Sequence, residues 1–207
     1  MDYDFYVDGW NRRVGETTAH LKTDGKFLVK EDLEQFYDKA IDGINFNKKS
    51  VLDIGCGGGL LGEYLLYKND CTYTGIDIAE RSVQAAKERL KDLNAMIIII
   101  PDPLCISGIL NNEFDIAICL NVIQHIPDRE YFDLFLQALN ESGINQLILQ
   151  FKFKPVTTFQ ANPYQTTHEI NLACYTNQKA VKKALGNYKI TSSKKSGENI
   201  FMQLEKN

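Results

Sequence analysis

One short stretch, VLDIGCGGGLL at residues 51–61, constrains the fold of this chain more than any other feature. An apolar run ends in Asp53, and residues 55–59 include four glycines before the apolar pattern resumes. Glycine adopts left-handed backbone conformations readily, so this run predicts a tight turn between a buried strand and a helix. Such a turn also lets a ligand lie against backbone amides where the helix begins. The stretch therefore predicts an α/β domain with a ligand site after one of its strands.

Apolar periodicity alternates along the chain between strand-like and helix-like segments, with residues 1–30 irregular. The predicted strands are 50–54, 72–76, 96–100 (a buried run), 114–120, 144–153, 188–193 and 199–205, the last two forming a hairpin around 194–197. The predicted helices are 33–44, 60–65, 83–93, 103–110, one capped by Asp128 that continues through Leu139, and one capped by Thr176 that continues through Leu185. Strands that alternate with helices imply parallel βαβ units. We expect a doubly wound α/β fold, with a mostly parallel seven-stranded sheet and a C-terminal antiparallel hairpin.

The overall composition limits the classes of function. The 207 residues are 44% hydrophobic and carry a formal net charge of −4, whereas a chain that grips many phosphates would usually be basic. Five cysteines without a CxxC pair predict neither disulfides nor a metal site, and they favour a cytoplasmic setting. The acidic, aromatic N-terminus does not resemble a signal peptide, and the longest apolar run is too short to cross a membrane.

Three kinds of ligand fit a glycine-rich turn, and the flanking residues discriminate between them. A nucleoside triphosphate site requires Gly-Lys-Ser/Thr, and no lysine follows these glycines. A dinucleotide site is harder to dismiss, because residues 57–62 match GxGxxG and Asp77 follows about 20 residues later. Asp53 favours a third kind, because a buried carboxylate needs a cationic or hydrogen-bond-donating partner and would repel a pyrophosphate. S-adenosylmethionine (SAM), which carries an ammonium and a sulfonium group, suits this acid.

Several segments together resemble the class I SAM-dependent methyltransferases, over roughly residues 31–207. VLDIGCGGG is similar to the first motif of that family, YTGIDIAERSVQAAKERL to its second strand, and FDIAICLNVIQHIPD to its fourth strand and following loop. The C-terminal hairpin is similar to the family's reversed last strand. The resemblance implies that SAM is the cofactor, that Asp77 holds both ribose hydroxyls and that Asp102, in PDPL, approaches the adenine. The other cofactor contacts that it implies are Asp53, Gly55, Cys56, Gly57, Ile78 and Asn121.

The acids and the cysteine of these motifs also have structural interpretations. Asp53 can bond the amides of its own glycine turn, and Asp77 can cap the helix that follows it. Asp102 precedes Pro103 and can shape a plain turn. Cys56 is expected to pack as a small side chain rather than to act as a nucleophile.

The first 30 residues are predicted to form a lid over the cofactor, or else a hydrophobic plug. WNRR, at residues 10–13, is similar to a Trp-acid-x-Arg pattern of some small-molecule methyltransferases. That resemblance implies that Trp10 and Arg13 help to hold the cofactor carboxylate, although Asn11 stands in place of the acid. The alternative is a solvated charge pair beside a buried tryptophan. Tyr6 is a candidate substrate contact.

His125 is the candidate catalytic base. It follows the fourth predicted strand, at the edge where open parallel sheets bind ligands, and a neutral imidazole can accept a proton from the acceptor. The alternative is a packing or loop-shaping role. The long polar segment 155–173 is the predicted substrate cover, with Tyr164 and His168 as candidate contacts.

The sequence thus predicts one catalytic domain, residues 31–207, that transfers a methyl group from SAM to nitrogen or oxygen of a small molecule. The loop after the fourth strand reads LNVIQH rather than Asn/Asp-Pro-Pro-Tyr, which disfavours amino-methylation of nucleic acids. Three alternatives stay open: an RNA or protein methyltransferase, a non-catalytic SAM-binding subunit, and an NAD-dependent oxidoreductase. A monomer or a homodimer is expected, with no membrane partner.

Overall fold

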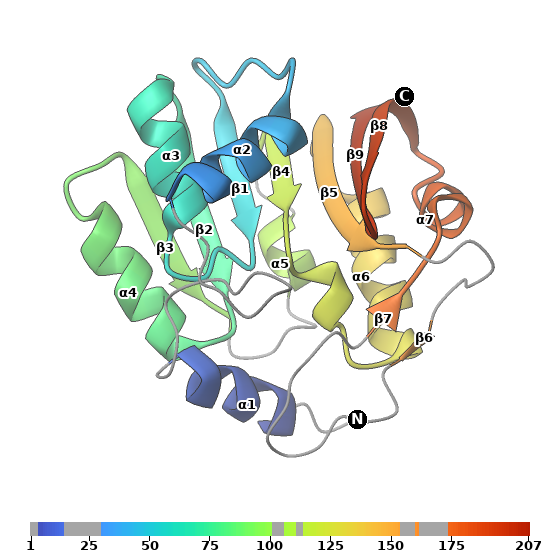
Figure 1. Ribbon diagram of the computed structural model, residues 1–207, viewed down its shortest axis with the longest axis horizontal. Coiled ribbons are helices and arrows are strands. Elements are labelled where there is room, and N and C mark those ends of the chain that lie inside the picture. Colours follow the sequence, from blue (N-terminus) through green and yellow to red (C-terminus); the bar gives the residue numbers. More distant parts are fainter. Residues whose placement is uncertain (1–3, 15–29, 101–105, 111–113, 154–159, 162–173) are drawn as a thin grey trace.

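The computed structural model describes residues 4–14, 30–100, 106–110, 114–153, 160–161 and 174–207. A seven-stranded sheet has the order β3-β2-β1-β4-β5-β9-β8 (Figure 1). Its strands are β1 (Ser50–Ile54), β2 (Thr72–Asp77), β3 (Ala95–Ile99), β4 (Ile116–Cys119), β5 (Gln146–Lys152), β8 (Tyr188–Ser196) and β9 (Asn199–Lys206). The helices are α1 (Asp4–Val14), α2 (Lys30–Ile41), α3 (Leu60–Lys68), α4 (Glu80–Leu90), α5 (Ile106–Leu110), the 3-10 turn η2 (Ile123–His125), α6 (Arg129–Glu141) and α7 (Gln178–Ala184).

Strand direction confirms the predicted doubly wound fold. β1 pairs in parallel with β2 and β4, β2 with β3, and β4 with β5. β9 pairs antiparallel with both β5 and β8. The second strand of the C-terminal hairpin is therefore inserted between β5 and β8, and it alone among the seven described strands of this sheet runs backwards.

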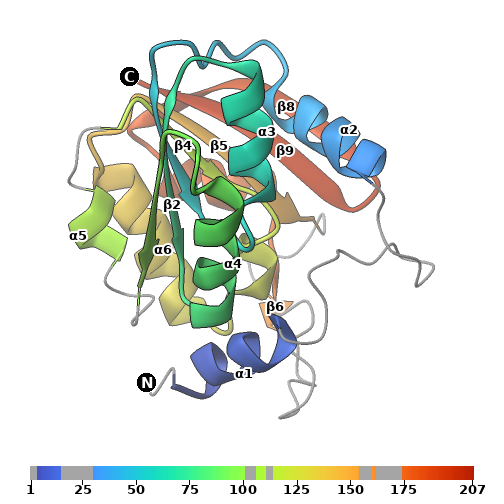
Figure 2. The same cartoon turned by 90° about the vertical axis from the view of Figure 1, so that its left-hand side faces the viewer.

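Helices cover both faces of the sheet, as helices that connect parallel strands do. Figure 2 shows α5 and α6 on one face and α2, α3 and α4 on the other. Strand residues alternate between the two buried layers. Leu52, Ile76 and Leu149 face the α5–α6 layer, and Val51, Tyr73 and Ile118 face the α2–α4 layer.

The structure corrects two predictions about chain segments. Residues 4–14 form helix α1 rather than irregular chain, and Tyr6 on it is buried in the core layer of α5 and α6. The run 96–100 is not buried on both faces, because β3 lies at the edge of the sheet. Met96 and Ile99 are 61% and 41% exposed. Apolar composition predicts a strand, but strand order decides which strand has only one neighbour.

Helices α6 and α7 both begin at a capping side chain, and the sequence identifies one of the two correctly. Asp128 caps α6, since its carboxylate accepts the amide proton of Tyr131 at 2.8 Å. Thr176 does not cap α7, because it is fully buried in a bridge to Phe153. The next residue, Asn177, caps that helix by accepting the amide proton of Ala180 at 2.9 Å. A threonine held in a bridge leaves the capping position to its neighbour.

Several predicted site residues lie outside the described residues. These are Asp102, Tyr164 and His168, together with most of the predicted cover 155–173. Within that cover only Gln160–Ala161 is described, as strand β6, which pairs antiparallel with β7 (Cys174–Tyr175). None of the described helices combines the length and the hydrophobicity that a membrane span requires.

Candidate cofactor and substrate site

The predicted site residues that the structure describes gather at one edge of the sheet, where the parallel strands end. The glycine turn follows β1, Asp77 ends β2, and Asn121 and η2 follow β4. Helix α1 lies across this edge (Figure 1). Ligands of open α/β sheets bind outside the carboxyl ends of the strands, beside the point where the order reverses. Here that point lies between β1 and β4, so the observed edge is the predicted one.

The glycine turn is built from left-handed residues. Gly55, Gly57 and Gly59 have φ angles of 74°, 53° and 79°. The amides of Gly55 and Cys56 both donate to the carbonyl oxygen of Ile76, at 2.8 and 3.0 Å, which ties the turn to the end of β2. Gly59 then begins α3.

The space around the turn is uneven. A Cβ on Gly55 would lie 2.2 Å from Cγ2 of Val122, whereas a Cβ on Gly57 would meet nothing within 4 Å. Gly55 therefore allows close packing of the β1 turn against the β4 loop. Gly57 leaves room for a ligand to approach the backbone.

Asp77 is tied to the glycine turn through its carboxylate. Oδ2 accepts the amide proton of Gly57 at 2.9 Å, and Oδ1 accepts that of Ala79 at 2.8 Å. Burial raises the pKa of this carboxyl, against the lowering effect of backbone donors that include Ile78. A carboxylate offers about four lone-pair sites, so the two oxygens retain capacity for further donors. As a residue, Asp77 is intermediate between buried and exposed, so it is not sealed in the core.

Asp53 is 3% exposed and points into the α2–α4 layer. Its Oδ2 accepts the hydroxyl proton of Tyr73, on the adjacent strand β2, at 2.5 Å. The structural interpretation expected Asp53 to bond the amides of its own glycine turn. The structure shows a hydrogen bond from Tyr73 instead. Burial raises its pKa to about 7, while the Tyr73 bond lowers it and the nearby Asp77 raises it. A cation close to Asp53 would favour its charged form, and that contact stays a prediction.

The raised pKa of Asp53 predicts an unusual pH dependence of stability. Its usual value is 3.8 and its folded value about 7, so between these two values the folded state binds more protons than the unfolded state. The free energy of unfolding therefore falls as pH rises through this window. Asp53→Asn, which keeps an acceptor for Tyr73, is expected to be more stable than the wild-type protein at pH 8, by on the order of a few kcal/mol. The advantage should shrink toward pH 4.

Urea unfolding of both proteins across this pH range measures the effect. Asp115→Asn is the matched control, because the Ser50 amide and Lys49 lower the pKa of Asp115. Its carboxylate therefore contributes stability that is lost as pH falls, and the substitution should destabilise the protein at pH 8. If the free energy of unfolding of Asp53→Asn equals that of the wild-type protein at every pH, the pKa of Asp53 is not raised in the folded state.

Two further side chains brace the glycine turn. Arg89 on α4 donates from Nε to the carbonyl oxygen of Gly58 at 2.8 Å and forms an ion pair with Glu63 on α3 at 3.1 Å. Cys56 is buried in the α2–α4 layer, and burial raises the pKa of its thiol well above the usual value. Cys56 thus packs as a small side chain, and its proposed contact with the cofactor is through its backbone.

The loop after β4 carries Asn121 in a left-handed conformation, with φ of 60°. Such a conformation is uncommon outside glycine, although asparagine tolerates it better than most residues. The amide of Asn121 donates to Oε1 of Gln150 at 2.7 Å. Val122 then packs against Gly55, and η2 follows with His125 at its end. Sequence reasoning singled out Asn121 but not Gln150, which is a polar residue within the apolar strand β5.

Helix α1 contacts this edge through aromatic side chains. The ring centroids of Trp10 and His125 are 4.8 Å apart, in an edge-to-face arrangement. Tyr6 contacts both Trp10 and Tyr131 of α6, with centroids 6.4 Å apart in each pair. Helix α1 also meets α4, where Asn11, the residue after Trp10, accepts the Arg81 amide proton at 3.5 Å. The structure thus brings Tyr6, Trp10 and His125 together, as separate sequence arguments did not.

The roles of Arg13 and His125 remain predictions. Arg13 lies on α1, but its side chain lies outside what the structure describes. His125 lies at the predicted edge, and its contact with Trp10 suits the packing role as well as the catalytic one. No group of three or more His, Cys, Asp or Glu side chains suited to hold a metal ion occurs among the described residues.

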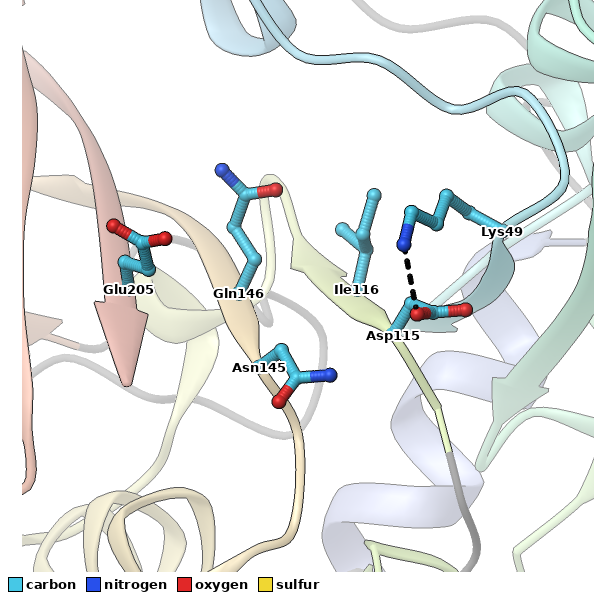
Figure 3. Close-up of a pocket in the computed structure, with 6 residues that line it drawn as sticks. All are labelled: Lys49, Asp115, Ile116, Asn145, Gln146 and Glu205. Atoms are coloured by element: carbon cyan, nitrogen blue, oxygen red, sulfur yellow. Dashed lines mark hydrogen bonds and ion pairs between the residues drawn. The ribbon is translucent and has the colours of Figure 1, made fainter. Parts of the chain in front are cut away.

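A small polar cleft lies at the opposite edge of the sheet. It is lined by Lys49, Asp115, Ile116, Asn145, Gln146 and Glu205. Figure 3 shows Lys49 directed at Asp115, with their charged atoms 3.1 Å apart. This cleft lies where β1, β4 and β5 begin, away from the glycine turn, and its lysine is already paired. It is therefore not the candidate site.

Strand order, a glycine turn after β1 and an acid at the end of β2 define the class I methyltransferase fold. Residues 51–143 match the family model of a methyltransferase domain. That segment is similar to methyltransferase domains, and the chain as described has the class I fold.

Curated relatives are similar in sequence over this half of the chain. A ubiquinone biosynthesis O-methyltransferase of Neisseria meningitidis serogroup C is 30% identical over 110 residues, which are 50% of this chain and 45% of that protein. The enzyme of the same name from Idiomarina loihiensis is 38% identical over 96 residues, which are 45% of this chain and 37% of that protein. The chain thus matches less than half the length of these relatives.

Solved structures share the fold over the whole chain. The magnesium protoporphyrin IX methyltransferase ChlM of Synechocystis PCC 6803, with bound S-adenosylhomocysteine (SAH), is 19% identical, with a TM-score of 0.66 over 100% of this chain and 97% of that one. The [4+2]-cyclase SpnF is 12% identical, with a TM-score of 0.70 over 99% of this chain and 93% of that one. At these identities the similarity establishes the fold alone.

Proposed function

We propose that this protein is a SAM-dependent methyltransferase that acts on an oxygen of a small molecule. The observation that carries the proposal is the hydrogen bond between the glycine turn and Asp77. The Gly57 amide bonds the Asp77 carboxylate, while the space around the Gly57 Cα is open. A carboxylate with spare acceptor capacity beside an open backbone suits a ribose diol, which offers two hydroxyl donors.

The charges at the site suit SAM better than a dinucleotide. Asp53 and Asp77 lie close enough to each other for the charge of Asp77 to raise the pKa of Asp53. A charged Asp53 repels a pyrophosphate, whereas an ammonium or sulfonium group is attracted to it. An acid at the position of Asp77 suits the ribose of either ligand. Arg89, the cation nearest the turn among the interactions described, is already paired with Glu63. NAD binding is therefore disfavoured.

Each residue has a role in this proposal. When bound, SAM supplies a methyl group on a positively charged sulfur atom. Asp77 orients the ribose, and the backbone at Gly55–Gly57 and Asn121 lines the pocket. Asp53, on β1 just before the turn, attracts the cationic end of SAM. Helix α1 limits access of water through Trp10 and Tyr6, and Arg13 is assigned to the cofactor carboxylate. The cofactor carries the reactivity, and the protein contributes binding, orientation and electrostatics.

His125 is proposed as the base that takes the proton of the acceptor hydroxyl. Its place after β4, beside Trp10 of α1, brings an imidazole to the edge at which the methyl group would be presented. The names of the sequence relatives favour an oxygen acceptor over nitrogen. The net charge of −4 supports a small molecule over a nucleic acid, and free thiols at Cys56, Cys71 and Cys119 support a cytoplasmic setting.

Isothermal titration calorimetry with SAM, SAH and NAD tests the cofactor. We expect micromolar binding of the first two, about −8 kcal/mol, and no binding of NAD. Methyl transfer from radiolabelled SAM to a panel of phenols, alcohols, acids and amines then tests the reaction. His125→Gln should bind SAH normally and transfer methyl about 100-fold more slowly if His125 is the base. Tighter binding of NAD than of SAM would overturn the proposal, and binding without transfer to any acceptor would favour a non-catalytic subunit.

A further inference from the structure

Gln150 is a polar residue in the centre of an apolar strand. It is 0% exposed on β5, between Leu149 and Phe151, which are equally buried. A buried amide is costly unless its hydrogen-bonding groups are satisfied. The Oε1 atom accepts the amide proton of Asn121 at 2.7 Å. The Nε2 atom donates to Oε1 of Gln124 at 2.9 Å and to Oδ1 of Asn199 at 2.8 Å.

The bonds of Gln150 hold the loop after β4 at two points. One is the backbone of Asn121, the residue with the left-handed conformation. The other is the side chain of Gln124, within η2, which also reaches back to Oδ1 of Asn121 at 3.4 Å. A leucine at position 150 would leave the Asn121 amide without this acceptor. A left-handed non-glycine residue persists only where its surroundings hold it, so Gln150 supplies much of what keeps this loop in shape.

The third bond connects the loop to the C-terminal hairpin. Asn199 begins β9 and pairs with Lys152 of β5. The preceding residue, Glu198, accepts the amide proton of Phe153 at 2.8 Å, at the point where the chain leaves β5. One buried amide therefore joins the β4 loop, the hairpin turn and the exit of β5.

We propose that Gln150 is a positioning residue for methyl transfer. It fixes the Asn121–His125 loop in the shape that receives the amino-acid end of the cofactor, and it couples that loop to the hairpin through Asn199. This inference rests on the proposed function for the identity of the ligand. It goes beyond the proposed function by assigning a role to a fully buried residue that lies outside the motifs of the sequence analysis.

The test compares two buried glutamines on neighbouring strands. Gln203 on β9 is also buried, and its Nε2 atom donates to the carbonyl oxygens of Ala40 and Asp42 at 3.0 Å each. Gln203→Leu therefore removes bonds to backbone without touching the β4 loop. We expect Gln150→Leu to weaken SAH binding by about 10-fold or more, and Gln203→Leu to leave it within about twofold, at similar losses of unfolding free energy.

Amide hydrogen exchange gives a readout that does not depend on a ligand. The Asn121 amide should exchange faster in Gln150→Leu than in the wild-type protein or in Gln203→Leu. Asn199→Ala and Gln124→Ala, which each remove one arm of the network, provide milder variants should Gln150→Leu fail to fold. Each should weaken SAH binding without unfolding the protein.

The outcomes separate this inference from the proposed function. If the wild-type protein binds SAH and the Gln150, Gln124 and Asn199 variants bind it equally well, the positioning role is wrong. If both leucine variants weaken binding to the same extent, the effect is general loss of stability and the inference is likewise overturned. If the wild-type protein binds neither SAM nor SAH, the proposed function fails, and unchanged exchange of the Asn121 amide in Gln150→Leu would dismiss the role of Gln150 in holding the loop as well.

Discussion

Gly55→Ala is expected to destabilise the protein by about 2–5 kcal/mol and to abolish measurable SAH binding. Two costs combine at this position. The φ angle of 74° is one that alanine rarely adopts, and the new Cβ would lie 2.2 Å from Cγ2 of Val122. The turn does not shift easily, because the amides of Gly55 and Cys56 both donate to the carbonyl oxygen of Ile76. The turn would have to move away from the β4 loop, which separates the two backbones proposed to line the pocket.

Controls distinguish the steric clash from the backbone strain. Gly43 has a similar φ angle of 80°, but a Cβ there would meet nothing within 4 Å. Gly43→Ala should therefore cost only about 1–2 kcal/mol and leave SAH binding unchanged. Val122→Ala combined with Gly55→Ala should recover part of the stability, because it removes the clashing methyl groups. Urea unfolding and calorimetry with SAH measure both effects, and equal losses for Gly43→Ala and Gly55→Ala would refute the packing argument.

Much of the fold is predictable because it depends on local patterns. The alternation of apolar runs and helical stripes predicts the five parallel strands and the hairpin, and the glycine-rich turn predicts the edge at which the candidate site lies. Asp77 follows the same logic, since an acid that ends the second strand of such a unit must lie beside the turn after the first. These features follow from residues that are close in sequence or from the geometry of a single βαβ unit.

The remainder depends on contacts between distant segments. β3 reads as a buried strand, but its exposure follows from the order of strands in the sheet. Tyr73 bonds Asp53 because the parallel register places Asp53 opposite Gly75, so that the tyrosine lies two residues away on the same face. That register is not written in either strand alone. Helix α1 was missed because its stability comes from aromatic contacts with η2 and α6, in line with the general weight of tertiary packing in short helices.

The candidate site shows the same division. The sequence singles out Asp53 for its unusual place in an apolar strand but not its hydroxyl partner. Gln150 is equally unusual in QLILQFK, and the same argument, applied to β5, would have marked it. A buried polar residue on a predicted central strand is therefore a signal worth following even where no motif surrounds it, since such a group requires partners.

Asp77→Ala is expected to weaken SAM and SAH binding by about 10- to 100-fold, the loss that removal of hydrogen bonds to a charged group produces. The substitution also frees the Gly57 and Ala79 amides, so part of the loss would arise from a looser glycine turn. Asp77→Asn separates the two contributions. Its amide oxygen still accepts one of these backbone protons, but it offers the ribose hydroxyls a weaker, neutral partner, so it should lie between the wild-type protein and the alanine variant.

Asp115 provides the matched control for Asp77. It too is an aspartate next to a strand, directly before β4 begins, and its carboxylate accepts the Ser50 amide proton at 2.9 Å and pairs with Lys49. It lies at the opposite edge of the sheet, in the cleft of Figure 3. Asp115→Ala should therefore lower the free energy of unfolding while SAH binding stays as in the wild-type protein. Calorimetry on the two alanine variants decides the matter: if Asp77→Ala binds SAH as tightly as Asp115→Ala does, the carboxylate that ends β2 does not hold the ribose, and the open backbone at Gly57 must receive some other part of the ligand.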